Sequence, residues 1–234
     1  MEETPDEIIW IIISFLKHKD LIRFSLTSRR NRFLVSNSKN NDGNIKLEET
    51  DYKIFLNISS DRRTRVFYQT VQGLLPRLFS LNLSFTKVTD VNSLGNVHTL
   101  NLSCTKVTDV NSLGNVHTLN LSFTKVTDVS ALGNVHTLDL SSTKVTDVSA
   151  LGNVHTLDLG CTRVTDVNSL GNVHTLYLSG TKVTDIKSLT GVHTLDLSST
   201  KVTDVSSLRK VDTLYLYNTK VTDVSMLKNA KIIK

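Results

Sequence analysis

From Leu81 onward, apolar and polar positions repeat every 19 residues, and successive copies of the pattern begin at Leu81, Leu100 and Leu119. Each copy is close to LNLSxTKVTDVxSLGNVHT, and eight copies follow one another without an insertion. A constant period is typical of a solenoid, in which each copy forms one rung that buries its apolar residues against the rungs on either side. The pattern therefore predicts a stack of eight rungs and a partial ninth strand at Ala230 to Ile233.

Six positions of the rung are apolar in every copy, and they predict the core. The alternation in Leu100-Asn101-Leu102 predicts a short half-buried strand. Asp109 precedes a single short turn, so its carboxylate is expected to accept a bond from a free N–H there. Gly114-Asn115 is expected to form the tight return to the next strand. A rung of this length has no room for an α-helix beside the strand, so the convex side is expected to be a 3₁₀ turn or extended. The core positions are Val97, Leu100, Leu102, Val107, Val110 and Leu113.

The stretch VHTLNLSCTKVTDVNSL resembles a leucine-rich repeat of the short, internalin-like kind. Val97, Leu100 and Leu102 lie on the family pattern L-x-x-L-x-L-x-x-N-x-L. Thr105 takes the place of the family's asparagine, as threonine does in every rung, and its hydroxyl is expected to form a ladder along the loop backbone. The resemblance covers residues 78–234 and implies a β-solenoid with parallel strands.

Residues 1–77 do not share the period. Within residues 1–40, two amphipathic runs predict short helices, the first opened by Thr4 and Pro5 and followed by two acids. So small a helical module buries little surface and is expected to need a partner. Residues 41–77 read as a linker and an N-terminal cap of the solenoid, and the stretch 64–78 predicts a helix that ends near Gly73 and Pro76. The predicted fold class is thus α+β, a small helical module followed by the repeat solenoid.

The string TPDEIIWIIISFLKHKDLIRFSLTSRRNRFL resembles an F-box. Pro5, Glu7 and Ile8 match its opening signature, whereas Thr4 and Asn31 depart from it. The resemblance implies docking on the adaptor of an SCF-type ubiquitin ligase, and through the adaptor on a cullin. The alternative is that several of the apolar candidates form the module's own core. The candidate adaptor-binding residues are Pro5, Ile8, Ile9, Ile12, Phe15, Leu16, Leu21 and Phe24.

Rungs differ from one another at a few outward positions, which could encode a protein partner. Tyrosine is enriched at binding hot spots, and aspartates stand beside the tyrosines in the later rungs. The alternative is drift after recent duplication of one rung. The candidate substrate-binding residues are Asp158, Tyr177, Asp196, Tyr215 and Tyr217.

Charge and composition limit the partners. Lysine and arginine number 27 against 22 acids, a net charge of +5 spread along the chain, so no nucleic-acid partner is expected. The apolar run Ile8–Ile13 is too short to span a bilayer, so no membrane partner is expected, and the composition suits a cytoplasmic or nuclear protein. Cys104 and Cys161 stand three rungs apart, about 14 Å, which is beyond disulfide reach.

A column of six histidines, one per rung from His98 to His193, suggests a metal site or a pH response. Neighbouring histidines supply only two ligands, whereas metal sites need three or four, so no metal or other cofactor is expected. Charging the column would be mutually repulsive, so acid is expected to weaken the solenoid. The sequence has no nucleophile–base pair or phosphate loop, so no enzyme activity is expected. The resemblances imply a non-catalytic substrate-recognition subunit of an SCF-type ubiquitin ligase. The rival hypothesis is a leucine-rich-repeat scaffold with no ubiquitin role.

Overall fold

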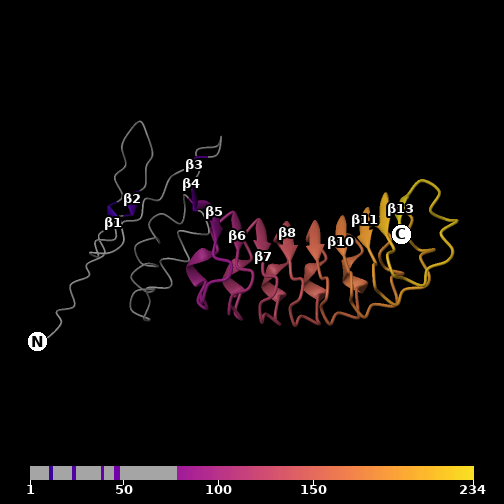
Figure 1. The fold of residues 1–234 in the computed structure, drawn as a ribbon, viewed down its shortest axis with the longest axis horizontal. Helices are drawn as coiled ribbons and strands as arrows, with labels where there is room; N and C mark the ends of the chain where they lie inside the picture. The colour runs from indigo at the N-terminus through magenta and orange to yellow at the C-terminus, as the bar shows by residue number, and fades with distance from the viewer. Residues whose placement is uncertain (1–10, 13–22, 25–37, 40–44, 48–77) are drawn as a thin grey trace, which may run out of the picture. The chain divides into compact units, whose positions relative to one another are not determined.

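A computed structural model divides the chain into an N-terminal unit of residues 1–82 and a solenoid unit of residues 83–234 (Figure 1). The structure describes the repeat region and four short stretches ahead of it, namely residues 11–12, 23–24, 38–39, 45–47 and 78–234.

Short strands make up the described part of the N-terminal unit. Strands β1 (Ile11–Ile12) and β2 (Arg23–Phe24) pair antiparallel. Strand β3 (Ser38–Lys39) pairs antiparallel with β4 (Ile45–Leu47), and β4 pairs parallel with β5 (Leu78–Asn82) across an irregularity in register.

The helices predicted for this unit are wrong at the residues that the structure describes. Ile11–Ile12 and Arg23–Phe24 are strands, which suits the β-branched Ile11–Ile12 pair. The capping helix, predicted to end near Gly73 and Pro76, lies outside the described residues, and β5 begins after it at Leu78. Among the adaptor-binding candidates, Ile12 lies in β1 and Phe24 in β2, and the rest of the predicted helices and candidates lie outside the described residues.

The solenoid unit is a parallel sheet with one strand per rung (Figure 1). Strands β6 to β12 pair in a register that matches equal positions of successive rungs, Thr99 with Thr118 in the first pair and Thr194 with Thr213 in the last. The period of the sequence therefore sets the register directly. The strands are β6 (Thr99–Asn101), β7 (Thr118–Asn120), β8 (Thr137–Asp139), β9 (Thr156–Asp158), β10 (Thr175–Tyr177), β11 (Thr194–Asp196), β12 (Thr213–Tyr215) and β13 (Lys231–Ile233).

The last strand departs from this register. Thr213 pairs with Lys231 and Leu214 pairs with Ile232, so the final interval is one residue shorter than the interval between the other paired strands. Ile232 thereby takes the core position beside Leu214, and Ile233 lies next to Tyr215 on the outward side. Two consecutive isoleucines make the slip possible, because either one can fill the apolar position.

The convex side begins with an aspartate turn in each rung. Asp109 Oδ1 accepts the backbone N–H of Asn111 at 3.0 Å, and the seven equivalent aspartates make the same bond at 2.8–3.0 Å. This confirms the role expected for Asp109. Five rungs continue into 3₁₀ helices, and the last three form turns without one. The 3₁₀ helices are η2 (Asn92–Leu94), η3 (Asn111–Leu113), η4 (Ser130–Leu132), η5 (Ser149–Leu151) and η6 (Asn168–Leu170).

Gly114 and Asn115 form the expected tight turn, which is closed by the bond from the N–H of Val116 to Leu113 O at 3.0 Å. Close packing between rungs, and not the turn itself, is what requires a glycine after the 3₁₀ helix. Gly114 has a φ of −61°, which any residue can adopt. A Cβ at Gly114 would lie 2.5 Å from the carbonyl oxygen of Ala131 in the next rung. Rungs that carry Thr190, Arg209 or Lys228 at this position are the rungs without a 3₁₀ helix, since a side chain cannot approach that carbonyl so closely.

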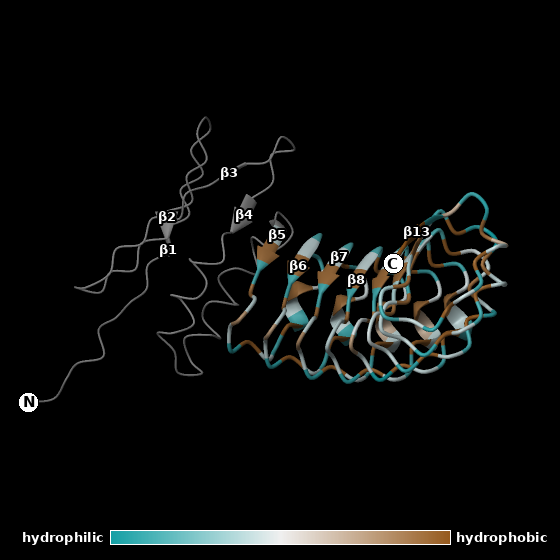
Figure 2. Cartoon of the chain, turned by 45° about the vertical axis from the view of Figure 1, so that its right-hand side comes forward, coloured by the Kyte–Doolittle hydropathy of each residue, from teal (hydrophilic) through white to brown (hydrophobic). Residues whose placement is uncertain are grey.

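All six predicted core positions are buried, with Val97, Leu102, Val107 and Leu113 fully inaccessible. Figure 2 shows the resulting recurrence of apolar and polar residues from rung to rung. The threonine column is buried as well, but the ladder expected of its hydroxyls is wrong. Thr105 Oγ1 donates to the carbonyl of Leu102 in its own rung at 2.7 Å.

Backbone groups connect the rungs at this level instead. The N–H of Leu102 donates to Asn120 O at 2.8 Å, and the N–H of Cys104 donates to Ser122 O at 2.9 Å. The N–H groups of Leu102 and Cys104 are thus satisfied by the next rung, and the threonine hydroxyl bonds within its own turn.

Candidate protein-interaction surface

The outward residues of strands β6 to β12 form one surface, which we call the strand face. Each strand directs its central leucine into the core, and the next residue along the chain points outward and is half-buried. Because the strands pair in register, these residues form a single column across the sheet. The column is Asn101, Asn120, Asp139, Asp158, Tyr177, Asp196 and Tyr215.

Four of the five candidate substrate-binding residues are therefore consecutive neighbours in this column. Asp158 pairs with Tyr177, Tyr177 with Asp196, and Asp196 with Tyr215. Tyr217 follows two positions later and is 70% exposed. The structure brings the candidates together on one face, and their role in binding stays a prediction.

Each acid of the column is held by the backbone. The Oδ1 atom of each aspartate accepts a hydrogen bond from the backbone N–H of the residue two positions later in the chain. The distances are 2.9 Å for Asp139, 2.8 Å for Asp158 and 2.7 Å for Asp196. Asn120 Nδ2 also donates to the other oxygen of Asp139 at 2.9 Å. One oxygen of each carboxylate is thus committed to the turn that follows the strand, and the charge is held in a defined place.

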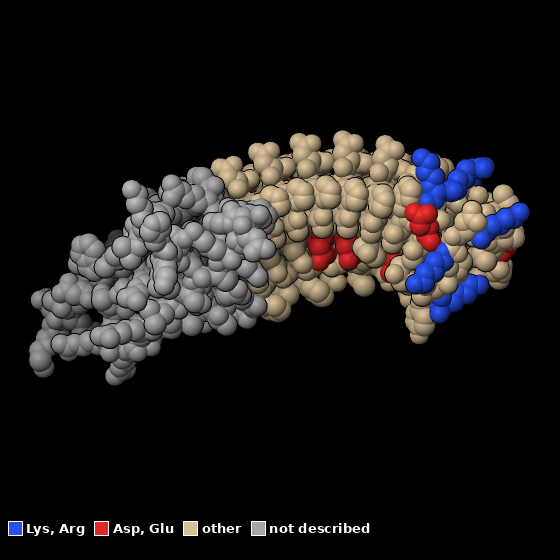
Figure 3. Space-filling view, turned by 90° about the horizontal axis from the view of Figure 1, so that it is seen from above, with Lys and Arg blue, Asp and Glu red and all other residues tan. Residues whose placement is uncertain are grey.

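Burial raises the pKa of the Asp158 carboxyl, and the negative charges of Asp139 and Asp196 raise it further, against the opposing hydrogen bond from Gly160. Figure 3 shows acidic side chains over the middle rungs with no lysine or arginine beside them, and basic side chains gathered over the C-terminal rungs. The exposed basic residues of those rungs include Arg209, Lys210, Lys228 and Lys231.

Two exposed phenylalanines follow the strands at the turn, and they were not among the substrate-binding residues predicted from the sequence. Phe85 and Phe123 are each 64% exposed and stand at the same turn position two rungs apart. Both have positive φ, 60° and 58°, in the left-handed region that favours glycine. The sequence signal for this turn was Gly180, which stands at the same position of its rung. A glycine there indicates that the position adopts a positive φ in every rung.

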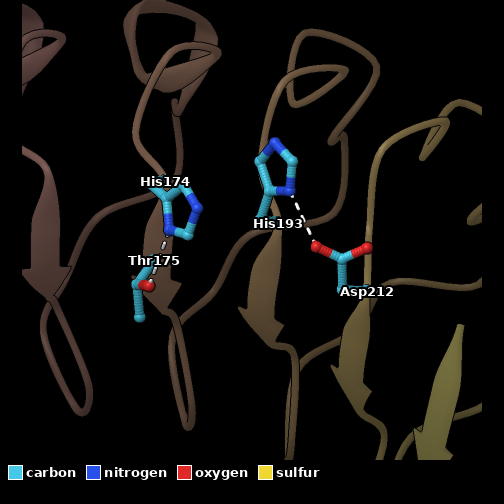
Figure 4. Close-up of polar contacts among 4 residues, drawn as sticks. All are labelled: His174, Thr175, His193 and Asp212. Atoms are coloured by element: carbon cyan, nitrogen blue, oxygen red, sulfur yellow. Dashed lines mark hydrogen bonds and ion pairs between the residues drawn. The ribbon is translucent and has the colours of Figure 1, made fainter.

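The histidine column forms a continuous stack that runs from rung to rung at the N-terminal ends of the strands. Successive ring centroids from His98 to His193 lie 4.4–4.7 Å apart, with interplanar angles of 8–13°. Figure 4 shows the end of the stack, where His193 Nδ1 lies 2.8 Å from Oδ2 of Asp212, while His174 Nδ1 lies 3.3 Å from Oγ1 of its neighbour Thr175. The stack is closed at this end by a carboxylate.

Partial burial lowers the pKa of His117 and His155, and the neighbouring histidines lower it further. Within the part of the chain that the structure describes, no group of three or more His, Cys, Asp or Glu side chains is arranged to hold a metal ion. The charges of neighbouring histidines thus disfavour the protonation of His117 and His155.

Cys104 and Cys161 are both free thiols, Cys104 half-buried and Cys161 exposed. Both cysteines stand at the same turn position as Phe85 and Phe123, and both have a positive φ, 57° for Cys104 and 56° for Cys161.

None of the described segments forms a helix with the length and apolar character needed to cross a bilayer.

Comparison with known proteins finds a match for each part of the chain. The sequence model of the F-box domain family matches residues 5–42. No curated protein matches the sequence at a significant level.

The fold of the repeats is shared with solved structures of bacterial proteins. Internalin C2 of Listeria monocytogenes is 28% identical with a TM-score of 0.59, over 70% of this chain and 82% of that one. An internalin (InlF) of the same organism is 22% identical with a TM-score of 0.58, over 68% of this chain and 54% of that one. A leucine-rich-repeat protein of Leptospira interrogans is 18% identical with a TM-score of 0.56, over 71% and 56%.

The present chain thus matches about half the length of the InlF structure, and the likeness concerns the fold of the repeat region. The parallel one-strand rungs, the buried leucine and valine columns and the 3₁₀ segments agree with that likeness. The chain therefore combines a match to the F-box domain family at residues 5–42 with a repeat solenoid whose fold is similar to that of internalins.

Proposed function

We propose that this chain is the substrate-recognition subunit of an SCF-type ubiquitin ligase. The observation that carries the proposal is the F-box match at residues 5–42 in a chain whose remainder is a repeat solenoid. F-box domains typically dock on the adaptor of such ligases, and leucine-rich repeats typically bind proteins. Both are interaction domains without catalytic groups of their own.

In this proposal the mechanism is tethering. The F-box holds the chain on the adaptor, and through it on the cullin, while the strand face holds a target protein. Holding both partners on one chain raises the effective concentration of the target near the ligase, and the rate of ubiquitin transfer rises with it. The chain itself has no chemical step to perform.

The variation along the strand face supports a binding role for the solenoid. Core positions are the same from rung to rung, because every rung must stack on identical neighbours. The outward column changes from asparagine to aspartate and tyrosine between β7 and β12 while its backbone stays in register. Since packing does not require these changes, they are the positions at which a partner is recognised.

Co-purification of the full chain tests the proposal. We expect the wild-type chain to capture an SCF adaptor, and the double variant P5A/I8D to lose at least about nine-tenths of it, because Pro5 and Ile8 stand in the opening F-box signature. D158N, a change on the strand face, is the matched control and should capture as much adaptor as the wild type. Absence of adaptor, or equal capture by P5A/I8D, would refute the ligase role and leave a leucine-rich-repeat scaffold.

A further inference from the structure

We propose that the strand face recognises an extended, arginine-bearing segment of the target protein, seated across Asp139, Asp158, Tyr177 and Asp196. The inference rests on the proposed function, since it takes the solenoid as the target-binding surface. It adds the chemical class of the ligand and names the side chains that select it.

Charge complementarity is the first argument. The outward column of β6 to β12 contains three aspartates and neither lysine nor arginine, a formal charge of −3 on the face of a chain whose net charge is +5. Among the described residues, no cation lies within ion-pair distance of Asp139, Asp158 or Asp196, and the ion pair in this region joins His193 to Asp212. A cationic partner is the complement that this face lacks.

The second argument is that the aspartates of the outward column lower the stability of the folded chain. Asp139 and Asp158 lie directly opposite each other on adjacent strands, about 4.8 Å apart, and like charges in such a pair destabilise a sheet. The turn does not need the charge, because Asn101 and Asn120 accept the same backbone bond through Oδ1 at 2.9 Å. Asparagine would thus do the structural task at no electrostatic cost, and what aspartate adds is affinity for a cation.

Tyr177 makes arginine the favoured cation. It lies in register between Asp158 and Asp196, so its ring has a carboxylate about one strand spacing away on either side. A guanidinium can stack on an aromatic ring and at the same time donate in its plane to a carboxylate, whereas an ammonium acts as a point charge. The sequence Asp-Tyr-Asp across three strands therefore fits arginine on both counts.

Gly160 gives the central carboxylate additional room. Glycine stands here where the neighbouring rungs have Ser141 and Ser179, and a Cβ at Gly160 would lie 3.1 Å from Asp158 Oδ1. The equivalent residues beside Asp139 and Asp196 are Ser141 and Ser198, so the glycine leaves more space at Asp158 than serine leaves at the other two carboxylates. Asp158 has Asp139 on the adjacent strand and Asp196 two strands away on the other side, which makes it the centre of the proposed site.

The test uses a fluorescently labelled peptide of alternating arginine and serine, whose arginines lie on one side when it is extended. Alternating lysine–serine and glutamate–serine peptides are the comparison probes, and binding to the full chain is followed by anisotropy at low and physiological ionic strength. We expect binding in the order arginine, lysine, glutamate, with the glutamate peptide not binding. Equal binding of all three, or no binding of the arginine peptide, would overturn the proposal.

Two charge-matched variants locate the site. D139N/D158N/D196N removes three charges from the strand face, and D147N/D166N/D204N removes three from the convex side of the same rungs. Asparagine keeps the backbone acceptor in both cases, so the urea midpoints of both variants serve as the folding check. We expect the strand-face variant to bind the arginine peptide about tenfold more weakly and the convex variant to bind within about twofold of wild type. Equal losses would place the binding elsewhere and refute the site.

Tyr177 supplies a separate readout. Y177F should keep the preference for arginine over lysine, and Y177S should lose it, while both keep the acids. An unchanged preference in Y177S would refute the role of the ring. Adaptor capture by D139N/D158N/D196N separates this inference from the ligase role. If this variant loses peptide binding but still captures the adaptor, the effect concerns the strand face alone. A chain that binds the arginine peptide but no adaptor would refute the ligase role and leave this inference standing.

Discussion

Acidification through the range in which histidine titrates should destabilise the solenoid, because six imidazoles from successive rungs are stacked in one row. Their centroids lie 4.4–4.7 Å apart, and protonation of two adjacent rings places like charges at that distance. Asp212, 2.8 Å from His193, offsets only the charge at that end of the row. The other rings face threonine hydroxyls, which are neutral.

The sign follows from the pKa shifts. Partial burial and neighbouring histidines lower the pKa of His117 and His155 in the folded chain. Between that lowered value and the unfolded value of about 6.5, the unfolded chain binds more protons than the folded one. The free energy of unfolding therefore falls as pH drops through about 6.5. The aspartates whose pKa is lowered by hydrogen bonds from the next turn lose their contribution only at more acidic pH, near and below about 4.

The spacing sets the magnitude. Two unit charges 4.6 Å apart in water interact by about 0.9 kcal/mol, so the five adjacent pairs sum to about 4–5 kcal/mol if every ring is charged. Protonation of alternate rings avoids most adjacent pairs, and salt screens the remainder in this exposed row. A loss of about 1–2 kcal/mol between about pH 7.5 and pH 5.5 is therefore expected.

The assay is urea unfolding of the full chain followed by circular dichroism at the two pH values, with the midpoint compared at equal slope. H117N/H155N removes the histidine–histidine neighbours except His174–His193 and should lose most of the pH dependence. H18N, which changes the one histidine outside the repeat, is the matched control and should behave as the wild type. A wild-type midpoint that does not move, or an equal shift in H117N/H155N, would refute the reasoning.

Three further substitutions test the packing of the rungs by thermal or urea unfolding. G114A should destabilise by about 1–3 kcal/mol because its Cβ would lie 2.5 Å from Ala131 O, and a neutral result would show that the rungs can separate there. S142G should stabilise by about 0.5–1 kcal/mol because Ser142 has a φ of 58°, and a loss of stability would mean that its side chain contributes more than its backbone costs. T143V should cost about 1 kcal/mol through the lost bond from Oγ1 to Leu140 O at 2.6 Å, and a gain would show that bond to be dispensable.

The resemblance of residues 1–40 to an F-box agrees with the family match at 5–42, yet the sequence misled about local structure at Ile11–Ile12 and Arg23–Phe24. Helical periodicity over a short run competes with β-branched propensity, and contacts distant in sequence decide between them. Apolar patterning also cannot separate side chains that contact an adaptor from those that fill the module's own core. Those contacts stay a prediction.

In the solenoid, the sequence by itself determined the rung, its strand and its buried positions, because alternation within one copy and stacking of identical copies are set by local periodicity. The aspartate turn was equally predictable, since donor and acceptor lie two positions apart. The same repetition indicated that the informative residues are the few that differ, and the structure places Asp158, Tyr177, Asp196 and Tyr215 side by side.

The tertiary structure alone decided the features that depend on atoms from different rungs. Gly114 is required by a carbonyl of the next rung, and the final strand slips by one position because Ile232 fits the core place beside Leu214. Thr105 bonds within its own turn, while the next rung accepts the N–H groups of Leu102 and Cys104. These are distances between rungs, and a one-dimensional pattern records which residues recur but not how closely their atoms approach.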